Sequence, residues 1–146
     1  MTADIRELTK RGWDAYFAHD LEGTLAGYAD EAVVELPGSP PFQGKDAIRA
    51  AWQMYMAAFP DEHPTAPLRH IVEGNTSVTI WQSEATHSGP LMTPTGDTLP
   101  ATGKKVAFKG VTVQEIEGDK LKKQTFYFDN AEFLQQLGFM PTMEGA

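Results

Sequence analysis

Residues 124–138, QTFYFDNAEFLQQLG, contain two kinds of secondary structure that meet at one aspartate. Strand-forming residues run from Gln124 to Phe128, whereas apolar residues recur at helical spacing after Asp129. We therefore expect a strand to end at Asp129 and a helix to begin at about Asn130. Aspartate is among the best N-cap residues, because its carboxylate accepts hydrogen bonds from backbone N–H groups two or three positions further on. Asp129 is thus either a helix cap or a carboxylate at the end of a pocket.

Alternation along this strand divides its side chains between two faces of a sheet. Thr125 and Tyr127 share the face of Asp129, so a pocket that contains Asp129 would also contain Tyr127. The other face carries Phe126 and Phe128. We expect these two residues, together with Ile116 of the preceding strand, to pack on a partner chain.

The rest of the chain predicts helices followed by strands. Helical spacing and caps indicate helices at residues 2–19, 21–28, 45–59 and 130–137. Asp20 is the expected N-cap of the second helix, and Pro60 ends the third. Strand patterns cover residues 32–36, 66–74, 77–89, 104–117 and 120–129, and residues 117–120 read as a hairpin turn. Helices first and antiparallel-type strands afterwards are typical of an α+β fold, and a curved sheet around a long helix makes a cone with a pocket.

The composition limits the classes of function. The 146 residues are 41% hydrophobic and 22% charged, which fits one globular domain over residues 1–146. The net charge of −8 argues against a nucleic-acid or anionic-membrane partner, because both need clustered lysine and arginine. The chain has no cysteine, no membrane-length apolar run, no signal-like N-terminus and no metal-ligand spacing. We therefore expect a cytoplasmic protein without a metal site.

Four stretches resemble the NTF2-like superfamily, and within it the SnoaL-like polyketide cyclase and ester cyclase group. They are YADEAVVELPGSPPFQGKDAIRAAW, FPD, PTGDTLPATGKKVAFKG and YFDNAEFLQQLG, at residues 28–52, 59–61, 94–110 and 127–138. The last is the most specific to the SnoaL-like group. The resemblance implies a cone-shaped fold, in which a curved antiparallel sheet wraps around helices and encloses an apolar pocket. It also implies a homodimer and chemistry without a cofactor.

In SnoaL-like cyclases the residue at the position of Asp129 is a general acid/base. The resemblance implies that it removes a proton from carbon, and that the enolate then attacks a carbonyl of the same molecule or is reprotonated. The cyclases pair this aspartate with a histidine on the preceding strand, but residues 104–117 contain none. The available polar partners are His87, which shares a strand face with Trp81, and Gln114, which can donate a hydrogen bond to an enolate oxygen.

Aromatic residues are numerous enough to form the wall of a pocket for a hydrophobic, carbonyl-bearing small molecule, although any single one of them is more often core. The expected substrate-binding residues are Trp13, Tyr16, Trp52, Tyr55, Trp81, Phe108 and Tyr127. Tyr16 and Tyr127 are also candidate hydroxyl donors. The alternative hypothesis is a non-catalytic module that binds a small molecule or forms a dimer, and the missing strand histidine favours it.

Overall fold

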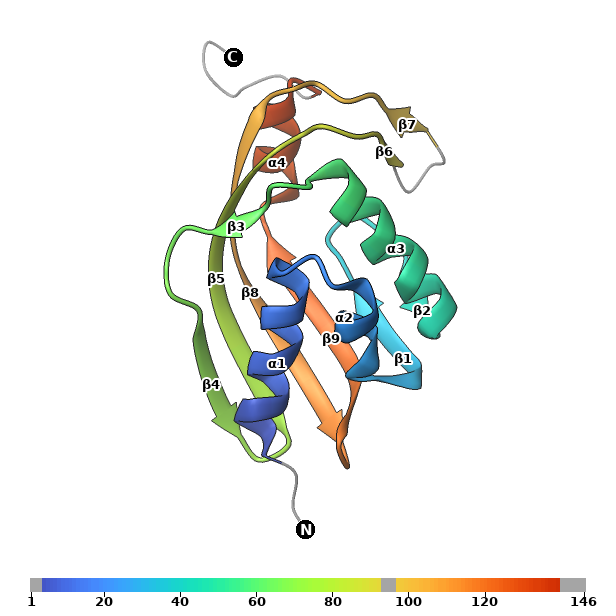
Figure 1. The fold of residues 1–146 in the computed structure, drawn as a ribbon, viewed down its shortest axis with the longest axis vertical. Coiled ribbons are helices and arrows are strands. Elements are labelled where there is room, and N and C mark those ends of the chain that lie inside the picture. The colour runs from blue at the N-terminus through green and yellow to red at the C-terminus, as the bar shows by residue number, and fades with distance from the viewer. Residues whose placement is uncertain (1–3, 93–96, 140–146) are drawn as a thin grey trace.

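A curved sheet wraps around the three N-terminal helices, and a fourth helix lies at one end of the sheet, in the computed structural model, which describes residues 4–92 and 97–139 (Figure 1). The helices are α1 (Ile5–Phe17), α2 (Leu21–Ala26), α3 (Lys45–Ala58) and α4 (Asn130–Leu137). The strands are β1 (Tyr28–Glu35), β2 (Phe42–Gln43), β3 (His63–Pro64), β4 (Arg69–Glu73), β5 (Thr76–Thr86), β6 (Leu91–Met92), β7 (Thr98–Leu99), β8 (Lys105–Glu117) and β9 (Lys120–Phe128). The predicted α+β class and the order of its main elements are confirmed.

The main sheet has the strand order β2-β1-β9-β8-β5-β3, and β4 pairs with β5 beside β3. All its pairs are antiparallel except β1 with β9, which run parallel. The sheet is therefore mixed, and the expectation of a purely antiparallel sheet is wrong at this one pair. A parallel pair needs a long connection between its strands, and here the whole chain between β1 and β9 forms it.

The helix caps follow the sequence closely. The Asp20 carboxylate accepts from the Gly23 N–H at 2.9 Å and begins α2. The Asp129 carboxylate accepts from the Glu132 N–H at 2.9 Å and begins α4, which ends at Gly138 in the left-handed region with a φ of 85°. Asp129 is thus the N-cap that its position predicts.

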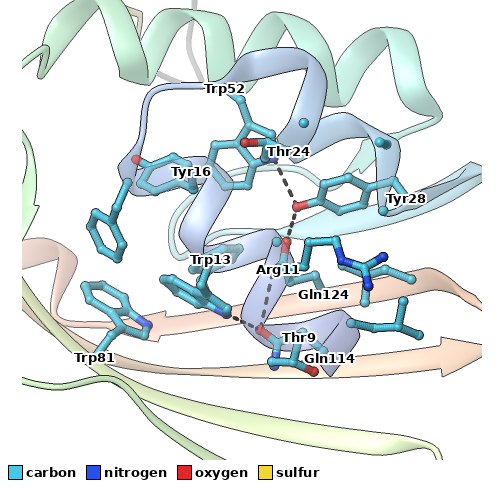
Figure 2. Close-up of a pocket in the computed structure, with 18 of the residues that line it drawn as sticks. Thr9, Arg11, Trp13, Tyr16, Thr24, Tyr28, Trp52, Trp81, Gln114 and Gln124 are labelled. Carbon is cyan, nitrogen blue, oxygen red and sulfur yellow. Dashed lines mark hydrogen bonds between the residues drawn. The ribbon is translucent and has the colours of Figure 1, made fainter. Parts of the chain in front are cut away.

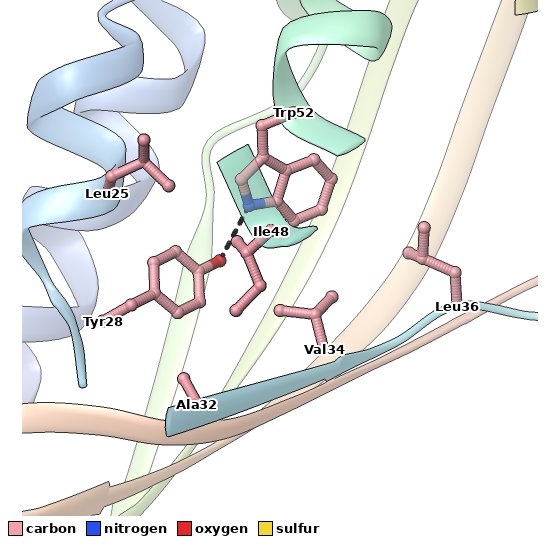
Figure 3. Packing of buried hydrophobic residues seen from close by; sticks show 7 residues of the cluster. All are labelled: Leu25, Tyr28, Ala32, Val34, Leu36, Ile48 and Trp52. Atoms are coloured by element: carbon pink, nitrogen blue, oxygen red, sulfur yellow. Dashed lines mark hydrogen bonds between the residues drawn. The ribbon is translucent and has the colours of Figure 1, made fainter. Parts of the chain in front are cut away.

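One core cluster joins α2, β1 and α3 (Figure 3). Ile48 and Trp52 lie four residues apart on α3, so both side chains point from one face of the helix onto β1. The seven buried members are Leu25, Tyr28, Ala32, Val34, Leu36, Ile48 and Trp52. A second cluster joins the end of α3 to β5, β8 and α4, and comprises Ala58, Phe59, Ala85, Leu91, Val106, Phe133 and Leu137.

The two faces of β9 are the reverse of the predicted assignment. Phe126 and Phe128 pack inward against the first core cluster, whereas Tyr127 is 59% exposed on the outer face. Two phenylalanines bury more apolar surface than Thr125 and Tyr127, so the hydrophobic effect selects this face. The predicted partner surface of Phe126, Phe128 and Ile116 is therefore wrong, because all three side chains point into the interior of the molecule.

The segment between β5 and β8 contains the two-stranded ribbon of β6 and β7. It lies at the C-terminal end of α3 in Figure 1, where the Ser88 N–H donates to the Ala58 carbonyl at 2.8 Å. Residues 93–96, between β6 and β7 in the sequence, lie outside the described residues.

Gly110 on β8 allows the Trp81 indole to lie against the sheet. A Cβ at Gly110 would stand 2.7 Å from the Trp81 ring and 2.5 Å from the Tyr127 carbonyl oxygen. We expect Gly110→Ala to lower the free energy of unfolding by about 1–3 kcal/mol, because neither the backbone nor the packed indole can move freely. Urea-induced unfolding measures this difference.

Gly12→Ala on α1 is the matched control, because a Cβ there meets nothing within 4 Å. We expect that variant to be stabilised by about 0.5–1 kcal/mol, since alanine in a helix restricts the unfolded chain more than glycine does. Equal stability of Gly110→Ala and the wild type would contradict the described contact with Trp81.

Candidate functional site

A cavity of about 440 Å³ lies between the three N-terminal helices and the inner face of the sheet. This volume is in the range of small-molecule sites. Its aromatic rings meet at angles, as in the edge-to-face pair of Tyr16 and Trp52, whose ring centroids are 5.7 Å apart. The aromatic lining residues are Trp13, Tyr16, Phe17, Tyr28, Trp52, Tyr55, Phe59, Trp81, Phe108, Phe126 and Phe128.

Most of the predicted wall lines this cavity. The six lining residues among the seven predicted are Trp13, Tyr16, Trp52, Tyr55, Trp81 and Phe108. Tyr127 is the exception, because it projects from the outer face of β9. The phenylalanines beside it in the sequence, Phe126 and Phe128, take its place in the wall.

Glu62 is the carboxylate inside this aromatic cavity. It follows α3 and lines the cavity. The Tyr16 hydroxyl donates to its Oε1 at 2.8 Å, and the Ser83 hydroxyl donates to its Oε2 at 2.8 Å. Burial raises the pKa of Glu62 above its usual range, and the two hydroxyl donors oppose that rise only in part. The site thus contains a carboxylate that is a stronger base than an exposed glutamate.

Three contacts fix the backbone on which Glu62 stands. The Asp61 carboxylate accepts from the Thr86 N–H at 2.7 Å, which helps to keep the pKa of Asp61 below its usual value. The Glu62 N–H donates to the Phe59 carbonyl at 3.2 Å. His19 Nε2 donates to the Glu62 carbonyl at 3.3 Å. Among residues 4–92 and 97–139, His19 is the only residue other than glycine with a positive φ, which is 59°. A strained histidine at this point therefore helps to position the turn.

Sequence reasoning missed Glu62. The stretch FPD that resembles the family ends one residue before it, and a glutamate in a turn ordinarily reads as solvent-exposed. One feature of the sequence could have pointed to Glu62. It lies four residues after the last residue of α3, the helix that supplies Trp52 and Tyr55 to the wall.

Two tyrosines near Glu62 stay protonated at neutral pH. Burial and the neighbouring Glu62 charge raise the pKa of Tyr55 to about 12 and that of Tyr16 well above its usual value. The Tyr16 hydroxyl is engaged by Glu62, whereas the Tyr55 hydroxyl has no hydrogen-bond partner in the part of the chain that the structure describes. Tyr55 is therefore the hydroxyl that remains available to a ligand.

Gln114 lines the cavity but is already fully hydrogen-bonded. Its Oε1 accepts from the Trp13 indole N–H at 3.0 Å and from the Gln124 amide at 3.4 Å. Its Nε2 donates to the Ser77 hydroxyl at 3.0 Å, with Ser77 O and Thr79 Oγ1 both at 3.3 Å. An amide nitrogen has only two hydrogens, so Gln114 has no spare donor for an enolate oxygen.

These bonds belong to one directed chain across the cavity (Figure 2). The Trp52 indole N–H donates to the Tyr28 hydroxyl at 3.1 Å, and that hydroxyl donates to Gln124 Oε1. Gln124 donates to Gln114, and Gln114 donates to Ser77. Beyond Ser77 the chain continues to the Thr9 hydroxyl at 2.6 Å, which donates to the Ile5 carbonyl at 2.8 Å.

Asp129 and His87 lie away from the cavity lining. Asp129 is exposed at the start of α4. His87 is fully buried, where its ring packs on Phe59 and its Nδ1 accepts from the Thr102 N–H at 3.3 Å. Burial lowers the pKa of His87, and its Nε2 has no partner among the described residues. The structure therefore does not bring the three predicted catalytic residues together.

Two kinds of feature are absent from the described residues. No group of three histidine or acidic side chains in residues 4–92 and 97–139 is arranged to hold a metal ion. No helix within those same ranges is both long and apolar enough to cross a membrane.

The raised pKa of Glu62 has a consequence for stability. The folded protein binds this proton more tightly than the unfolded chain, so the Glu62 contribution reduces stability as pH rises from the unfolded pKa through the folded one. We expect the free energy of unfolding of Glu62→Gln to increase relative to that of wild type as pH rises through that window, because glutamine has no charge to bury. Chemical unfolding at a series of pH values measures the difference. Parallel pH profiles of the two proteins would contradict a raised pKa.

The chain is similar to known proteins both in sequence and in structure. Residues 9–124 match the model of the SnoaL-like domain. Among curated proteins, none matches the chain. A candidate polyketide cyclase of Xanthomonas campestris pv. campestris superposes with a TM-score of 0.79 at 16% identity, over 91% of this chain and 96% of that chain.

Two other solved structures are similar. A candidate SnoaL-like polyketide cyclase of Jannaschia sp. CCS1 has a TM-score of 0.80 at 14% identity, over 94% of this chain and 93% of its own. IdmH of Streptomyces antibioticus, a candidate polyketide cyclase, has a TM-score of 0.72 at 23% identity, over 92% of this chain and 99% of its own. At these identities the likeness shows a shared fold, whereas the domain match covers most of the chain. The chain belongs to the SnoaL-like family, with an NTF2-like fold.

Proposed function

We propose that this protein is a cofactor-independent enzyme that transfers protons on a hydrophobic, carbonyl-bearing small molecule. The observation that supports the proposal is the Glu62 carboxylate inside an aromatic cavity, with a pKa raised by burial. A general base is most effective when its pKa lies near the working pH, and desolvation moves a glutamate in that direction.

The proposed step uses two groups of the cavity. Glu62 removes a proton from the carbon next to the substrate carbonyl, so the C–H electron pair becomes the enolate double bond and Glu62 becomes a neutral carboxylic acid. The Tyr55 hydroxyl donates a hydrogen bond to the carbonyl oxygen as negative charge develops there. Tyr16 and Ser83 hold the carboxylate in place through one hydrogen bond to each oxygen.

Two outcomes of the enolate are consistent with this arrangement. Reprotonation by Glu62 at a second carbon gives an isomerase. Attack of the enolate carbon on a second carbonyl of the same molecule gives an aldol-type cyclisation, in which the new alkoxide takes the proton back from Glu62. The solved relatives described as candidate polyketide cyclases favour the second outcome, by analogy of family. Both outcomes begin with the same proton abstraction, so one assay tests both.

Asp129 is the competing carboxylate, because the family resemblance gives it the role of acid/base. Asp129 is exposed outside the cavity, and its carboxylate is engaged by the Glu132 N–H. We therefore propose that Asp129 caps α4 and that Glu62 is the base. The alternative function, a binding module without chemistry, keeps the same cavity and gives neither carboxylate a role in turnover.

Exchange of a carbon-bound proton tests the proposal before the natural substrate is known. In D2O, a base in the cavity should catalyse deuterium incorporation next to the carbonyl of a fused-ring ketone such as β-tetralone, followed by proton NMR. We expect Glu62→Gln to reduce this rate by about 10²–10⁴-fold, because the amide cannot accept the proton. We expect Tyr55→Phe to reduce it by about 10²-fold.

Asp129→Asn is the matched control, because asparagine caps a helix as well as aspartate does. It should change the exchange rate by less than about threefold. Loss of exchange in Asp129→Asn with retention in Glu62→Gln would return the role of base to Asp129. Exchange that is unaffected in both variants would favour the binding module.

We also propose the homodimer that the family resemblance implies, formed through the outer face of the sheet. The strand register places apolar residues in neighbouring rows on that face: Ile71, Val78 and Val113 in one row, and Ile80, Val111 and Tyr127 in the next. Ile71 and Tyr127 are 44% and 59% exposed, and together with the valines and isoleucine of these rows they form a contiguous apolar surface of the kind that marks interfaces.

Sedimentation velocity tests this interface. We expect wild type to sediment as a dimer at micromolar concentration and Tyr127→Lys to sediment as a monomer, because the introduced ammonium cannot be buried between two sheets. Gln53→Lys places the same charge on an exposed site of α3 and should remain dimeric. A monomeric wild type would contradict the proposal.

A further inference from the structure

The Glu62 carboxylate lacks a cationic partner. Its hydrogen bonds come from two neutral hydroxyl groups, Tyr16 and Ser83, and no lysine or arginine forms an ion pair with it in the described part of the chain. His19 can hold a positive charge, but it contacts the main-chain carbonyl of Glu62 and lowers the pKa of Glu62 only as a minor cause.

The carboxylate also has unused capacity. An ionised carboxylate can accept about four hydrogen bonds, and Glu62 accepts one at each oxygen. Because its charged form is poorly compensated, a ligand that brings a positive charge into the cavity would gain the attraction that the protein does not supply. A ligand carboxylate or phosphate would instead be repelled.

The rings beside Glu62 suit the same kind of ligand. Tyr55 and Phe59 are stacked with centroids 6.5 Å apart, and Tyr16 stands edge-on to Trp52. The faces of aromatic rings attract cations, most strongly where water is excluded. A protonated amine on an apolar body would therefore find both a carboxylate and ring faces in one place.

The mouth of the cavity also carries a net negative charge. Its exposed charged residues are three acidic and two basic side chains: Asp4, Glu7, Asp119, Arg11 and Lys120. With Glu62, the cavity lining has four acidic and two basic residues, in a chain with a net charge of −8. This field attracts cations and repels anions on the way to the cavity.

We propose that the cavity binds hydrophobic amines in their protonated form, with the ammonium group paired to the Glu62 carboxylate among the surrounding aromatic rings. Such a ligand competes with a neutral carbonyl substrate, because it occupies the base itself. The inference rests on the proposed function only in taking the cavity as the ligand site, and equilibrium binding tests it without turnover.

A pair of nearly isosteric probes isolates the charge: para-tert-butylbenzylamine and para-tert-butylbenzyl alcohol. All three tryptophans of the chain, Trp13, Trp52 and Trp81, line the cavity, so tryptophan fluorescence reports occupancy. Near neutral pH we expect the amine to bind wild type at least about tenfold more tightly than the alcohol. In Glu62→Gln we expect the two affinities to agree within about twofold.

Glu84→Gln is the matched control for loss of a negative charge. Glu84 forms an exposed ion pair with His63 at 3.0 Å on the edge of the sheet and does not line the cavity. It should keep the wild-type preference for the amine. Equal binding of the two probes to wild type, or a preference that survives in Glu62→Gln, would overturn the proposal.

A measurement on wild type alone makes the test independent of how well the variant folds. As pH falls through the pKa of Glu62, the carboxylate is neutralised and the amine should lose its advantage, while the alcohol affinity stays constant in the folded protein. The charged groups that face Glu62 and could change this profile are His19 and Asp61, with Tyr16 and Tyr55 neutral throughout. If the preference for the amine stays the same as pH falls through the pKa of Glu62, the proposed pairing of the ammonium group with Glu62 is refuted.

The proton-exchange assay tests a different claim. A failure of proton exchange alone would refute the enzymatic proposal and leave the amine site intact.

Discussion

The buried amide of Gln114, near the C-terminal end of β8, makes the contacts on which the arrangement of the cavity depends. Its oxygen accepts from α1 through Trp13 and from β9 through Gln124, and its nitrogen donates to β5 through Ser77. A buried amide with a missing partner costs about 1–3 kcal/mol. The helix and the three strands must therefore sit where every one of these bonds is made, which also sets the direction in which the Trp13 ring faces the cavity.

The cavity that results combines two unlike environments. In one part of the cavity the polar atoms of the wall are hydrogen-bonded to each other. The rings of Trp13, Trp52 and Tyr28 therefore offer a ligand an apolar surface, although each ring carries a polar group. On the other side Glu62 keeps unfilled acceptor sites beside the open hydroxyl of Tyr55. Recognition of an apolar body and chemistry at one polar end can therefore be performed by different residues of the same cavity.

Local sequence patterns predicted much of the fold. Helical spacing gave α3, alternation gave β5, β8 and β9, and the cap preference of aspartate gave the starts of α2 and α4. The parallel pairing of β1 with β9 was not predictable, because it joins segments that are far apart in the sequence. Alternation separated the two faces of β9 correctly, but a period of two does not state which face is inside. The net gain from burying Phe126 and Phe128 decides that question, and with it the exposure of Tyr127.

The site was harder to predict than the wall around it. Aromatic residues on amphipathic helices point inward by periodicity alone, so Trp13, Tyr16, Trp52 and Tyr55 were within reach of the sequence. Glu62 belongs to a turn, where no period applies, and its burial depends on Tyr16 and Ser83 arriving from distant elements. Gln114 was within reach as a lining residue, but its saturation by Trp13, Gln124 and Ser77 was not.

The hydrogen-bond chain from Trp52 to Ile5 has one further consequence. Indole donors enter it at Trp52 and Trp13, a backbone carbonyl ends it, and the members between them are hydroxyl and amide groups. Tyr28 is its one ionisable member, and burial keeps the pKa of that hydroxyl far above neutrality. Acid or mild base therefore leaves this side of the cavity in the same bonding state while Glu62 gains or loses its proton. The cavity thus combines a charge that follows pH with a hydrogen-bonded wall that does not.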